Sequence, residues 1–203
     1  MRIRLGTRGS RLALVQTGLV ADRLRRAGNE VELVPIVTEG DLRPVDMVPG
    51  EGVFVAAIAQ ALRAGEVEVL VLAAAGVDRL GQGARIDERL DPKVVPPAPA
   101  QGALAVQARS EDKELLAALG ELDDGQVRFA VETERAVLEA SGGGCRAPLG
   151  ALVSPSEDGF RLLAFAVLPD GRVRGTSGSG AAEYIRAQAR EIGQWLAEGF
   201  RTP

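Results

Sequence analysis

One cysteine stands out as the residue with reactive chemistry. Cys145 is the only cysteine of the 203-residue chain, and within Ser141–Gly150 it follows three glycines and precedes Pro148. Glycine tolerates positive φ angles and lets a bulky group approach the backbone. A thiol presented in this way has the form of an attachment point or a nucleophile. On these residues alone, the favoured interpretation is a small buried side chain beside a turn, because free cysteine is often buried.

The chain contains no histidine. This excludes Ser-His-Asp and Cys-His catalysis within this sequence, as well as zinc sites that use imidazole. Acid–base chemistry would fall to carboxylates, the thiol or water. A lone cysteine cannot build a metal site by itself, so we predict none.

The composition is that of an ordinary globular protein, with 46% hydrophobic and 26% charged residues. A net charge of −4 gives no basic surface for nucleic acid. No segment approaches the roughly 18 apolar residues of a membrane span. The first residues lack the apolar core of a signal peptide. With one cysteine and no disulfide framework, we expect a cytoplasmic protein with no membrane partner.

Arginine dominates the basic residues, because only Lys93 and Lys113 among the 24 are lysines. Arginine binds carboxylates and phosphates with two parallel hydrogen bonds, which suits a polyanionic ligand. Genomic base composition would produce the same bias, so both explanations stay open.

The first half of the chain alternates between strand and helix patterns. The expected elements are a strand at Ile3–Leu5, a helix at Arg11–Arg26, a strand at Val31–Val37, a helix at Val53–Ala64 and a strand at Val67–Ala73. This order predicts an α/β fold with a mixed or parallel sheet and flanking helices. Gly6–Ser10 forms the expected turn after the first strand.

The second half predicts a small α+β domain with an antiparallel sheet. Its expected helices are Glu111–Leu119, Val127–Ala140 and Ala182–Ala197, and its expected strands are Leu149–Val153, Arg161–Leu168 and Val173–Thr176. Pro169–Gly171 supplies a turn between the last two strands. Pro92–Pro99 is an expected connector, and Ala103–Arg109 an additional strand. We place the domain boundary between residues 110 and 111.

Several segments, collinear along the chain, resemble the hydroxymethylbilane synthase family, also called porphobilinogen deaminase. They are Gly6–Leu14 with Gln16, Val34–Asp41, Gly50–Val55, Leu72–Gly81, Pro97–Leu104, Glu134–Ala136 and Gly143–Gly150. Any one of these motifs is weak, but their common order makes the resemblance specific.

The resemblance implies a transferase of haem and other tetrapyrrole biosynthesis. Such an enzyme condenses four porphobilinogen molecules, with release of ammonia, into linear hydroxymethylbilane. The growing chain is built on a dipyrromethane cofactor, and the resemblance assigns Cys145 as its covalent attachment residue. Thioether formation suits a soft sulfur nucleophile. The polypyrrole carries many carboxylates, which arginine and backbone N–H groups would bind.

The resemblance also implies roles for four other residues. Arg8, Ser10 and Gln101 match cofactor-binding positions, and Phe54 matches an aromatic residue of a loop that covers the site. Without the resemblance, Arg8 would be assigned to a surface ion pair, Ser10 to a helix N-cap and Phe54 to the core.

The chain differs from the family by lacking most of the second domain. The resemblance implies a periplasmic-binding-protein-like first domain, with residues 69–100 resembling the return from the missing domain and residues 111–203 forming the cofactor-attachment domain. The junction lies at or near Glu68 and Val69. Val67–Ala73 then fills the third-strand position of the first domain. Three explanations of the shortening stay open. The chain is a natural short paralogue, a protein with a deliberate deletion, or a sequence from which an internal stretch was omitted.

The missing stretch includes the family's His-Ser-x-Lys-Asp motif, whose aspartate transfers protons. No catalytic residue is therefore assigned, and Asp41, Asp46 and Asp78 do not inherit that role. Glu51 also stands where the family often has lysine. The alternatives are a non-catalytic anion- or pyrrole-binding paralogue, a domain-deleted remnant and, less favoured, a thiol peroxidase. We expect a monomer.

Overall fold

The computed structural model describes residues 2–9, 11–36, 60–106, 108–144 and 147–201. These residues form two compact units. The first contains residues up to 96 together with 147–148, and the second contains 97–144 and the residues from 149 onward. Each unit has its own sheet, one parallel and one antiparallel, as the mixed α/β prediction requires. None of the described helices is long and apolar enough to cross a membrane.

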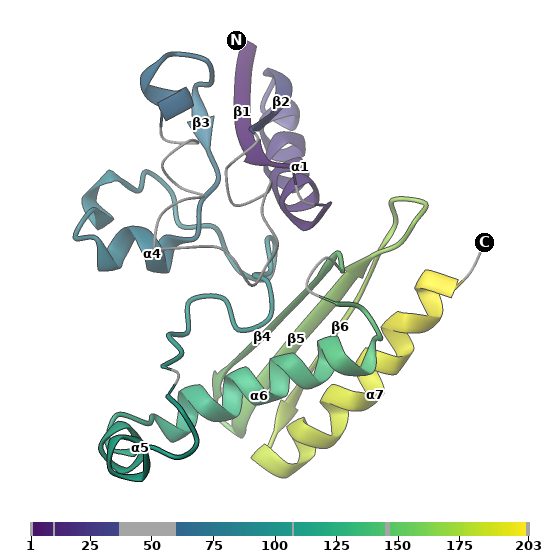
Figure 1. Ribbon diagram of the computed structural model, residues 1–203. Helices are drawn as coiled ribbons and strands as arrows, with labels where there is room; N and C mark the ends of the chain where they lie inside the picture. The colour runs from purple at the N-terminus through teal and green to yellow at the C-terminus, as the bar shows by residue number, and fades with distance from the viewer. Residues whose placement is uncertain (1, 10, 37–59, 107, 145–146, 202–203) are drawn as a thin grey trace. The chain divides into compact units, whose positions relative to one another are not determined.

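The first unit is built on a parallel sheet of order β2-β1-β3 (Figure 1). Its elements are β1 (Arg2–Arg8), α1 (Arg11–Arg26), β2 (Glu30–Ile36) and β3 (Val69–Leu70). In the register, Leu5 of β1 pairs with Leu33 on one side and with Val69 on the other. The predicted strand at 67–73 therefore does lie beside β1, although only two of its residues pair with β1 in the ladder.

Apolar side chains of β1, β2 and α1 meet in a small core. Ile3, Leu5, Ala21 and Val31 are buried there. The hydroxyl of Thr17 on α1 donates to the hydroxyl of Thr7 on β1 across 2.7 Å. A buried hydroxyl needs a partner, and this pair satisfies the requirement while fixing the helix against the strand.

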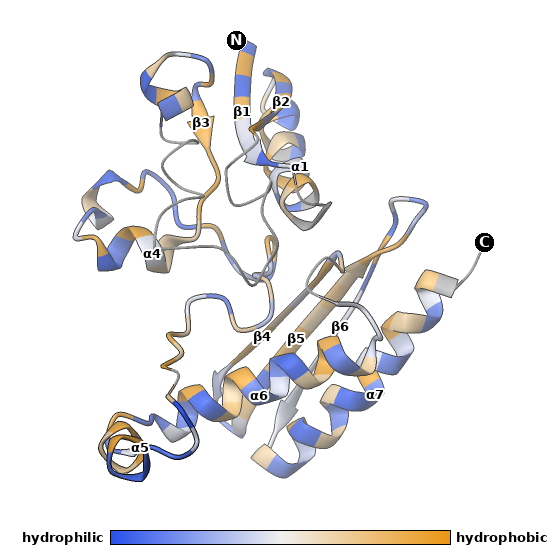
Figure 2. Ribbon diagram, in the orientation of Figure 1, coloured by the Kyte–Doolittle hydropathy of each residue, from blue (hydrophilic) through white to orange (hydrophobic). Residues whose placement is uncertain are grey.

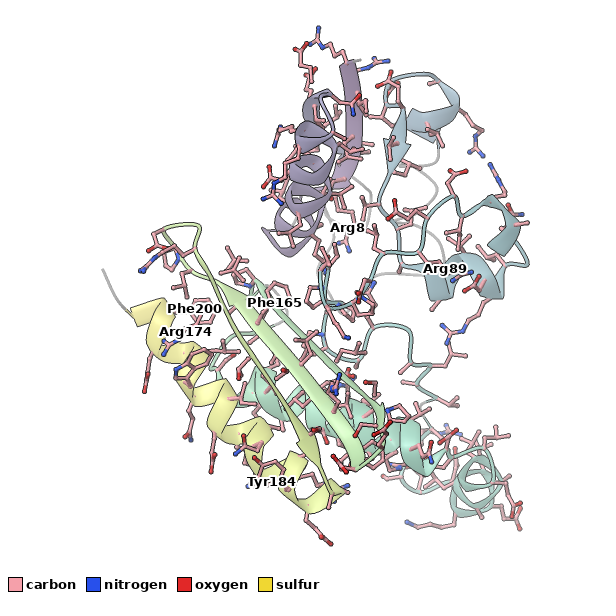
Figure 3. The ribbon with its side chains drawn as sticks, turned by 180° about the vertical axis from the view of Figure 1, so that it is seen from behind. Arg8, Arg89, Phe165, Arg174, Tyr184 and Phe200 are labelled. Atoms are coloured by element: carbon pink, nitrogen blue, oxygen red, sulfur yellow. The ribbon has the colours of Figure 1, made fainter. Side chains whose placement is uncertain are left out.

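Two short helices follow β3, namely α4 (Ala74–Arg79) and the 3-10 helix η2 (Gly83–Arg85). Arg89 holds the Asp78 carboxylate of α4 through two hydrogen bonds of 2.6 and 2.9 Å (Figure 3). Of the predicted helix at 53–64, the structure describes only the end, where residues 60–63 are helical.

The second unit is an antiparallel sheet with two long helices across one face (Figure 1). Its elements are α5 (Lys113–Gly120), α6 (Gly125–Ala140), β4 (Leu149–Ser156), β5 (Gly159–Val167), β6 (Val173–Gly180) and α7 (Ala182–Arg201). The sheet order is β4-β5-β6. Asp124 caps α6, its carboxylate accepting from the backbone N–H groups of Gln126 and Val127.

The core of the second unit lies between the sheet and the helices α6 and α7. Its fully buried large side chains include Val137, Leu149, Leu162, Ile185 and Leu196. The two helices approach closely at Gly193, where an added Cβ would lie 2.4 Å from the Val137 carbonyl oxygen. Only glycine permits this contact without movement of a backbone.

One expected element is absent. The described residues of 103–109 form no strand, and Leu104 and Val106 are 69% and 68% exposed. Alternating apolar residues become a strand only when a neighbouring strand supplies hydrogen bonds, and no described residue pairs with them. The following helix α5 also has no buried residue, and the ribbon of its apolar residues is orange in Figure 2.

Candidate functional site

The cysteine loop is held at both ends by elements of the second unit. It begins where α6 ends, at Ser141, and it leads into β4 at Leu149. Ser141 closes the helix, because its hydroxyl donates to the Leu138 carbonyl oxygen at 2.7 Å and accepts from the Gly143 N–H at 3.2 Å. Gly142 has a φ of 67°, which favours glycine after a helix. Cys145 itself lies outside the described residues.

Glu134 of α6 is a buried carboxylate next to this loop in the sequence. Its exposure is 5%, and it accepts hydrogen bonds from two backbone amides. One oxygen accepts from the Val153 N–H of β4 at 2.7 Å, and the other accepts from the Ala100 N–H at 2.6 Å. Burial raises the pKa of the Glu134 carboxyl, and the two amide hydrogen bonds partly offset that rise.

Gln101 lies in the turn that Glu134 contacts. The Gln101 N–H donates to the Ala98 carbonyl oxygen at 3.0 Å, and the Gln101 side-chain oxygen accepts from the Ala98 N–H at 3.1 Å. The Pro97 carbonyl oxygen accepts from the Ala151 N–H of β4 at 3.1 Å, which ties the turn to the strand. Gln101 is exposed, so the turn presents it to solvent.

Arg8 lies at the carboxyl end of β1 in the first unit (Figure 3). Its side chain is partly buried, and α1 begins three residues later at Arg11. The first turn of α1 contains no acidic residue. The carboxyl end of a parallel strand followed by a helix N-terminus is a favourable place for an anion.

The predicted site residues are distributed over both units. Arg8 belongs to the first unit and Gln101 to the second. Ser10, Phe54 and Cys145 lie outside the described residues, so their assigned roles remain predictions.

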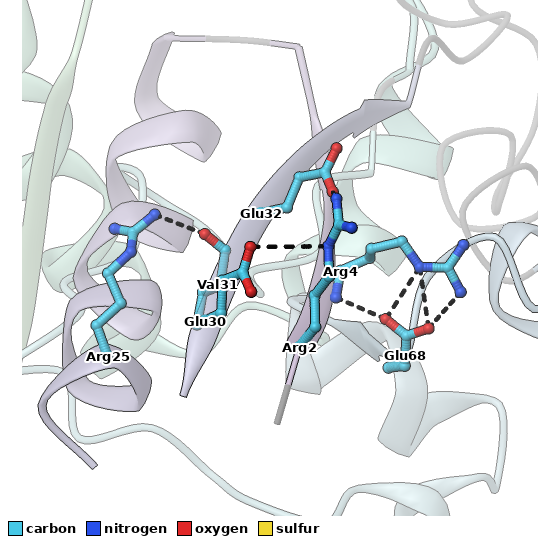
Figure 4. A network of polar contacts seen from close by, with 7 residues as sticks. All are labelled: Arg2, Arg4, Arg25, Glu30, Val31, Glu32 and Glu68. Carbon is cyan, nitrogen blue, oxygen red and sulfur yellow. Dashed lines mark hydrogen bonds and ion pairs between the residues drawn. The ribbon is translucent and has the colours of Figure 1, made fainter. Parts of the chain in front are cut away.

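Glu68, at the predicted junction with Val69, forms an ion pair with Arg4 of β1 (Figure 4). The Glu68 carboxylate accepts from the Arg4 backbone N–H at 2.6 Å and from the Arg4 guanidinium. Arg4 also donates to the Gly65 carbonyl oxygen at 2.7 Å. The guanidinium hydrogen bonds keep the pKa of the Glu68 carboxyl below its ordinary value.

Two further arginines donate to groups of β2. Arg2 donates to the Glu32 carboxylate at 2.9 Å, and Arg25 of α1 donates to the Val31 carbonyl oxygen at 2.9 Å (Figure 4). Arg2 and Arg4 thus link β1 to β2 and to Glu68 beside β3, whereas Arg25 links α1 to β2. Exposed ion pairs of this kind contribute little to stability.

The sequence motif includes Glu134 but does not predict its buried contacts. The pattern that indicates burial is its helical spacing, because Glu134 stands on the same face of α6 as Val137 and Ala130, with Thr133 beside it. An acidic residue on an apolar helix face indicates a buried carboxylate with specific partners.

Comparison with known proteins gives a family match over the first part of the chain. The family described as porphobilinogen deaminase, dipyromethane cofactor binding domain, matches residues 3–71 and 62–117. The two matched segments share residues 62–71, and this overlap contains the predicted junction at Glu68 and Val69.

Several curated relatives match nearly the whole chain, and each is named porphobilinogen deaminase. The relative from Nocardia farcinica is 32% identical over 295 residues, covering 94% of this chain and 85% of the relative. The one from Roseiflexus sp. is 28% identical over 292 residues, covering 97% and 96%. The one from Mycobacteroides abscessus is 32% identical over 295 residues, covering 94% and 96%.

These alignments extend over more residues than the 203 of this chain. The relatives therefore contain internal residues that have no counterpart here. The identity, the coverage and the two segments of the family match nevertheless agree, and the chain belongs to the porphobilinogen deaminase family.

Proposed function

We propose that this chain acts as a hydroxymethylbilane synthase, a transferase that condenses porphobilinogen with loss of ammonia on a dipyrromethane attached to Cys145. The family match carries this proposal, because the matched domain is the one described as binding the dipyromethane cofactor. The non-catalytic alternative is not favoured, since the curated relatives that cover most of the chain are named porphobilinogen deaminase.

The residues of the chain are suited to the cofactor. The cysteine loop is anchored by α6 and β4, and it contains the glycines that a bulky adduct needs. When bound, dipyrromethane supplies the pyrrole end to which further units are added. Cys145 supplies the sulfur of the thioether. Arg8 and the N-terminus of α1 supply the positive charge and N–H groups that carboxylates require.

The proposal also gives roles to Gln101, Ser10 and Phe54. The Gln101 amide is fixed by its turn and presents a donor and an acceptor to a pyrrole. Ser10 would bind a carboxylate at the start of α1, and Phe54 would exclude water. No carboxylate of this chain is assigned to proton transfer.

The proposal extends to the domains of the chain, its oligomeric state and its location. We infer a periplasmic-binding-protein-like first domain over residues 1–110, with 69–100 returning from the position of the missing domain. Residues 111–203 form the cofactor-attachment domain. The compact units divide the chain earlier, after Pro96, because the 97–101 turn packs on β4. We further propose a monomer located in the cytoplasm.

The experiment is the intact mass of the chain expressed in cells that make porphobilinogen, compared with a Cys145→Ala variant. The expected result is a mass excess of two pyrrole units that the variant lacks. Incubation with porphobilinogen should then release ammonia and hydroxymethylbilane. A bare mass for the unaltered chain would overturn cofactor attachment. A loaded chain that releases no product would limit the function to pyrrole binding.

A further inference from the structure

We propose that Glu134 is a positioning residue that fixes the Gln101 turn against β4. Its carboxylate joins three elements that are far apart in the sequence, namely α6, the turn at Ala98–Gln101 and the strand that follows the cysteine loop. We also expect Glu134 to affect the attachment of dipyrromethane to Cys145, and this expectation rests on the proposed function. The effect of Glu134 on the turn does not depend on that function.

The turn has a backbone that needs external support. Pro99 occupies its second position, and Ala100, at its third position, has a φ of 62°. This pattern is that of a type II turn, in which the third position strongly favours glycine or asparagine. Among the described residues, Ala100 is the only non-glycine residue with a positive φ. Such a conformation persists only where surrounding contacts enforce it.

The Glu134 carboxylate supplies that contact at the strained residue itself. The Ala100 N–H donates to one oxygen at 2.6 Å, while the Val153 N–H donates to the other at 2.7 Å. An ionised carboxylate accepts at both oxygens, whereas the glutamine amide has one acceptor oxygen and one NH₂ donor. Glu134→Gln therefore keeps the shape of the side chain and loses one of the two hydrogen bonds.

Stability alone does not explain a carboxylate at this position. Both partners are backbone amides rather than a cation, and burial makes the ionised form unfavourable. An apolar residue of similar size would remove that penalty. The feature that only the carboxylate provides is the simultaneous hold on the turn and on β4.

Hydrogen exchange measured by mass spectrometry tests the hold on the turn. We expect Glu134→Gln to raise amide exchange about tenfold in peptides covering 97–103 and 149–153, as expected for loss of one buried hydrogen bond. The matched control is Glu132→Gln, because Glu132 lies on the exposed side of the same helix. Equal exchange in the two variants would overturn the proposal.

A second variant separates positioning from general destabilisation. Ala100→Gly removes the conformational strain, so the double variant Glu134→Gln with Ala100→Gly should recover slow exchange in the turn. If Glu134→Gln alone does not fold, the double variant should restore folding as monitored by circular dichroism. The proposal would be overturned if the double variant recovered neither the slow exchange nor the folding that Glu134→Gln had lost.

Cofactor loading supplies the functional measurement. The fraction of chains that carry the Cys145-dependent mass excess should fall in Glu134→Gln, stay unchanged in Glu132→Gln and recover in the double variant. Normal loading in Glu134→Gln would overturn the functional part. An unloaded wild-type chain would instead refute the proposed function, and the exchange data would still decide the role of Glu134.

Discussion

The two units of this chain differ in how they are held together. Among the described residues, the first unit has a small core around Ile3 and Leu5 and a third strand of two paired residues. The second unit has three long strands, with two helices packed on one face and a continuous apolar core. The predicted junction at Glu68 and Val69 lies in the first unit, at β3. The elements that flank the cysteine loop, α6 and β4, belong to the second unit, whereas residues 147 and 148 of the loop cluster with the first.

The largest expected effect is a loss of stability on truncation of a core side chain in the second unit, with the first unit unaffected. Ile185→Ala, at a fully buried position of α7, should lower the free energy of unfolding of the second unit by about 2–5 kcal/mol. Trp195 is the only tryptophan of the chain and lies in α7, so its fluorescence in urea reports this unit. Leu5→Ala is the control, since it should leave the fluorescence midpoint unchanged. A shift of that midpoint would mean that the two units unfold together.

Equivalent glycine substitutions should have opposite effects in the two units. Gly193→Ala should lower the stability of the second unit by about 1–3 kcal/mol, because the new methyl group would overlap Val137. Gly18→Ala, in the interior of α1 with open space around it, should raise the stability of the first unit by about 0.5–1 kcal/mol. Urea unfolding by circular dichroism and by fluorescence measures both. Effects of the same sign would contradict the packing described.

The pH dependence of the second unit should reflect Glu134. Because its folded-state pKa is raised, the folded state binds the proton more tightly than the unfolded state does. Stability should therefore fall as the pH rises from the ordinary value of 4.5 through the raised value. Glu134→Gln should remove this dependence from the fluorescence-detected transition. A stability that rises with pH through this range, and does so only when Glu134 is present, would contradict the assignment.

The smallest effect, with the opposite sign, is expected at Glu68 in the first unit. The Arg4 guanidinium lowers the folded-state pKa of Glu68, so its stabilisation is present above the ordinary value of 4.5 and is lost as the pH falls through the lowered value. Glu68→Gln should weaken this acid-side dependence in circular dichroism. Salt should reduce the difference, since the pair is exposed. An effect larger than that of Gly18→Ala would refute this ranking.

Local sequence signals predicted much of the architecture. The Pro169–Gly171 turn is confirmed, because the Gly171 N–H donates to the Leu168 carbonyl oxygen at 3.0 Å and Gly171 has a φ of 83°. The strand β6 continues to Gly180, four residues beyond its predicted end at Thr176. Its added residues are two serines and two glycines, so their strand conformation comes from the ladder with β5 rather than from their own preference.

Contacts between distant residues were beyond such signals. Glu134 finds its partners 34 and 19 residues away, and Arg4 finds Glu68 64 residues away. Such pairings depend on the register of the folded sheets, which apolar periodicity does not specify for polar side chains. For the candidate site, the motifs supplied residue identities by resemblance, while the turn that carries Gln101 emerged only from the structure.

The exposed segment that follows the Gln101 turn has a practical consequence for handling the protein. Leu104 and Val106 lie in a segment that forms no described strand, and both side chains are largely exposed. Exposed apolar side chains of this kind promote association between chains. Leu104→Lys should therefore improve the solubility of concentrated samples without disturbing either core.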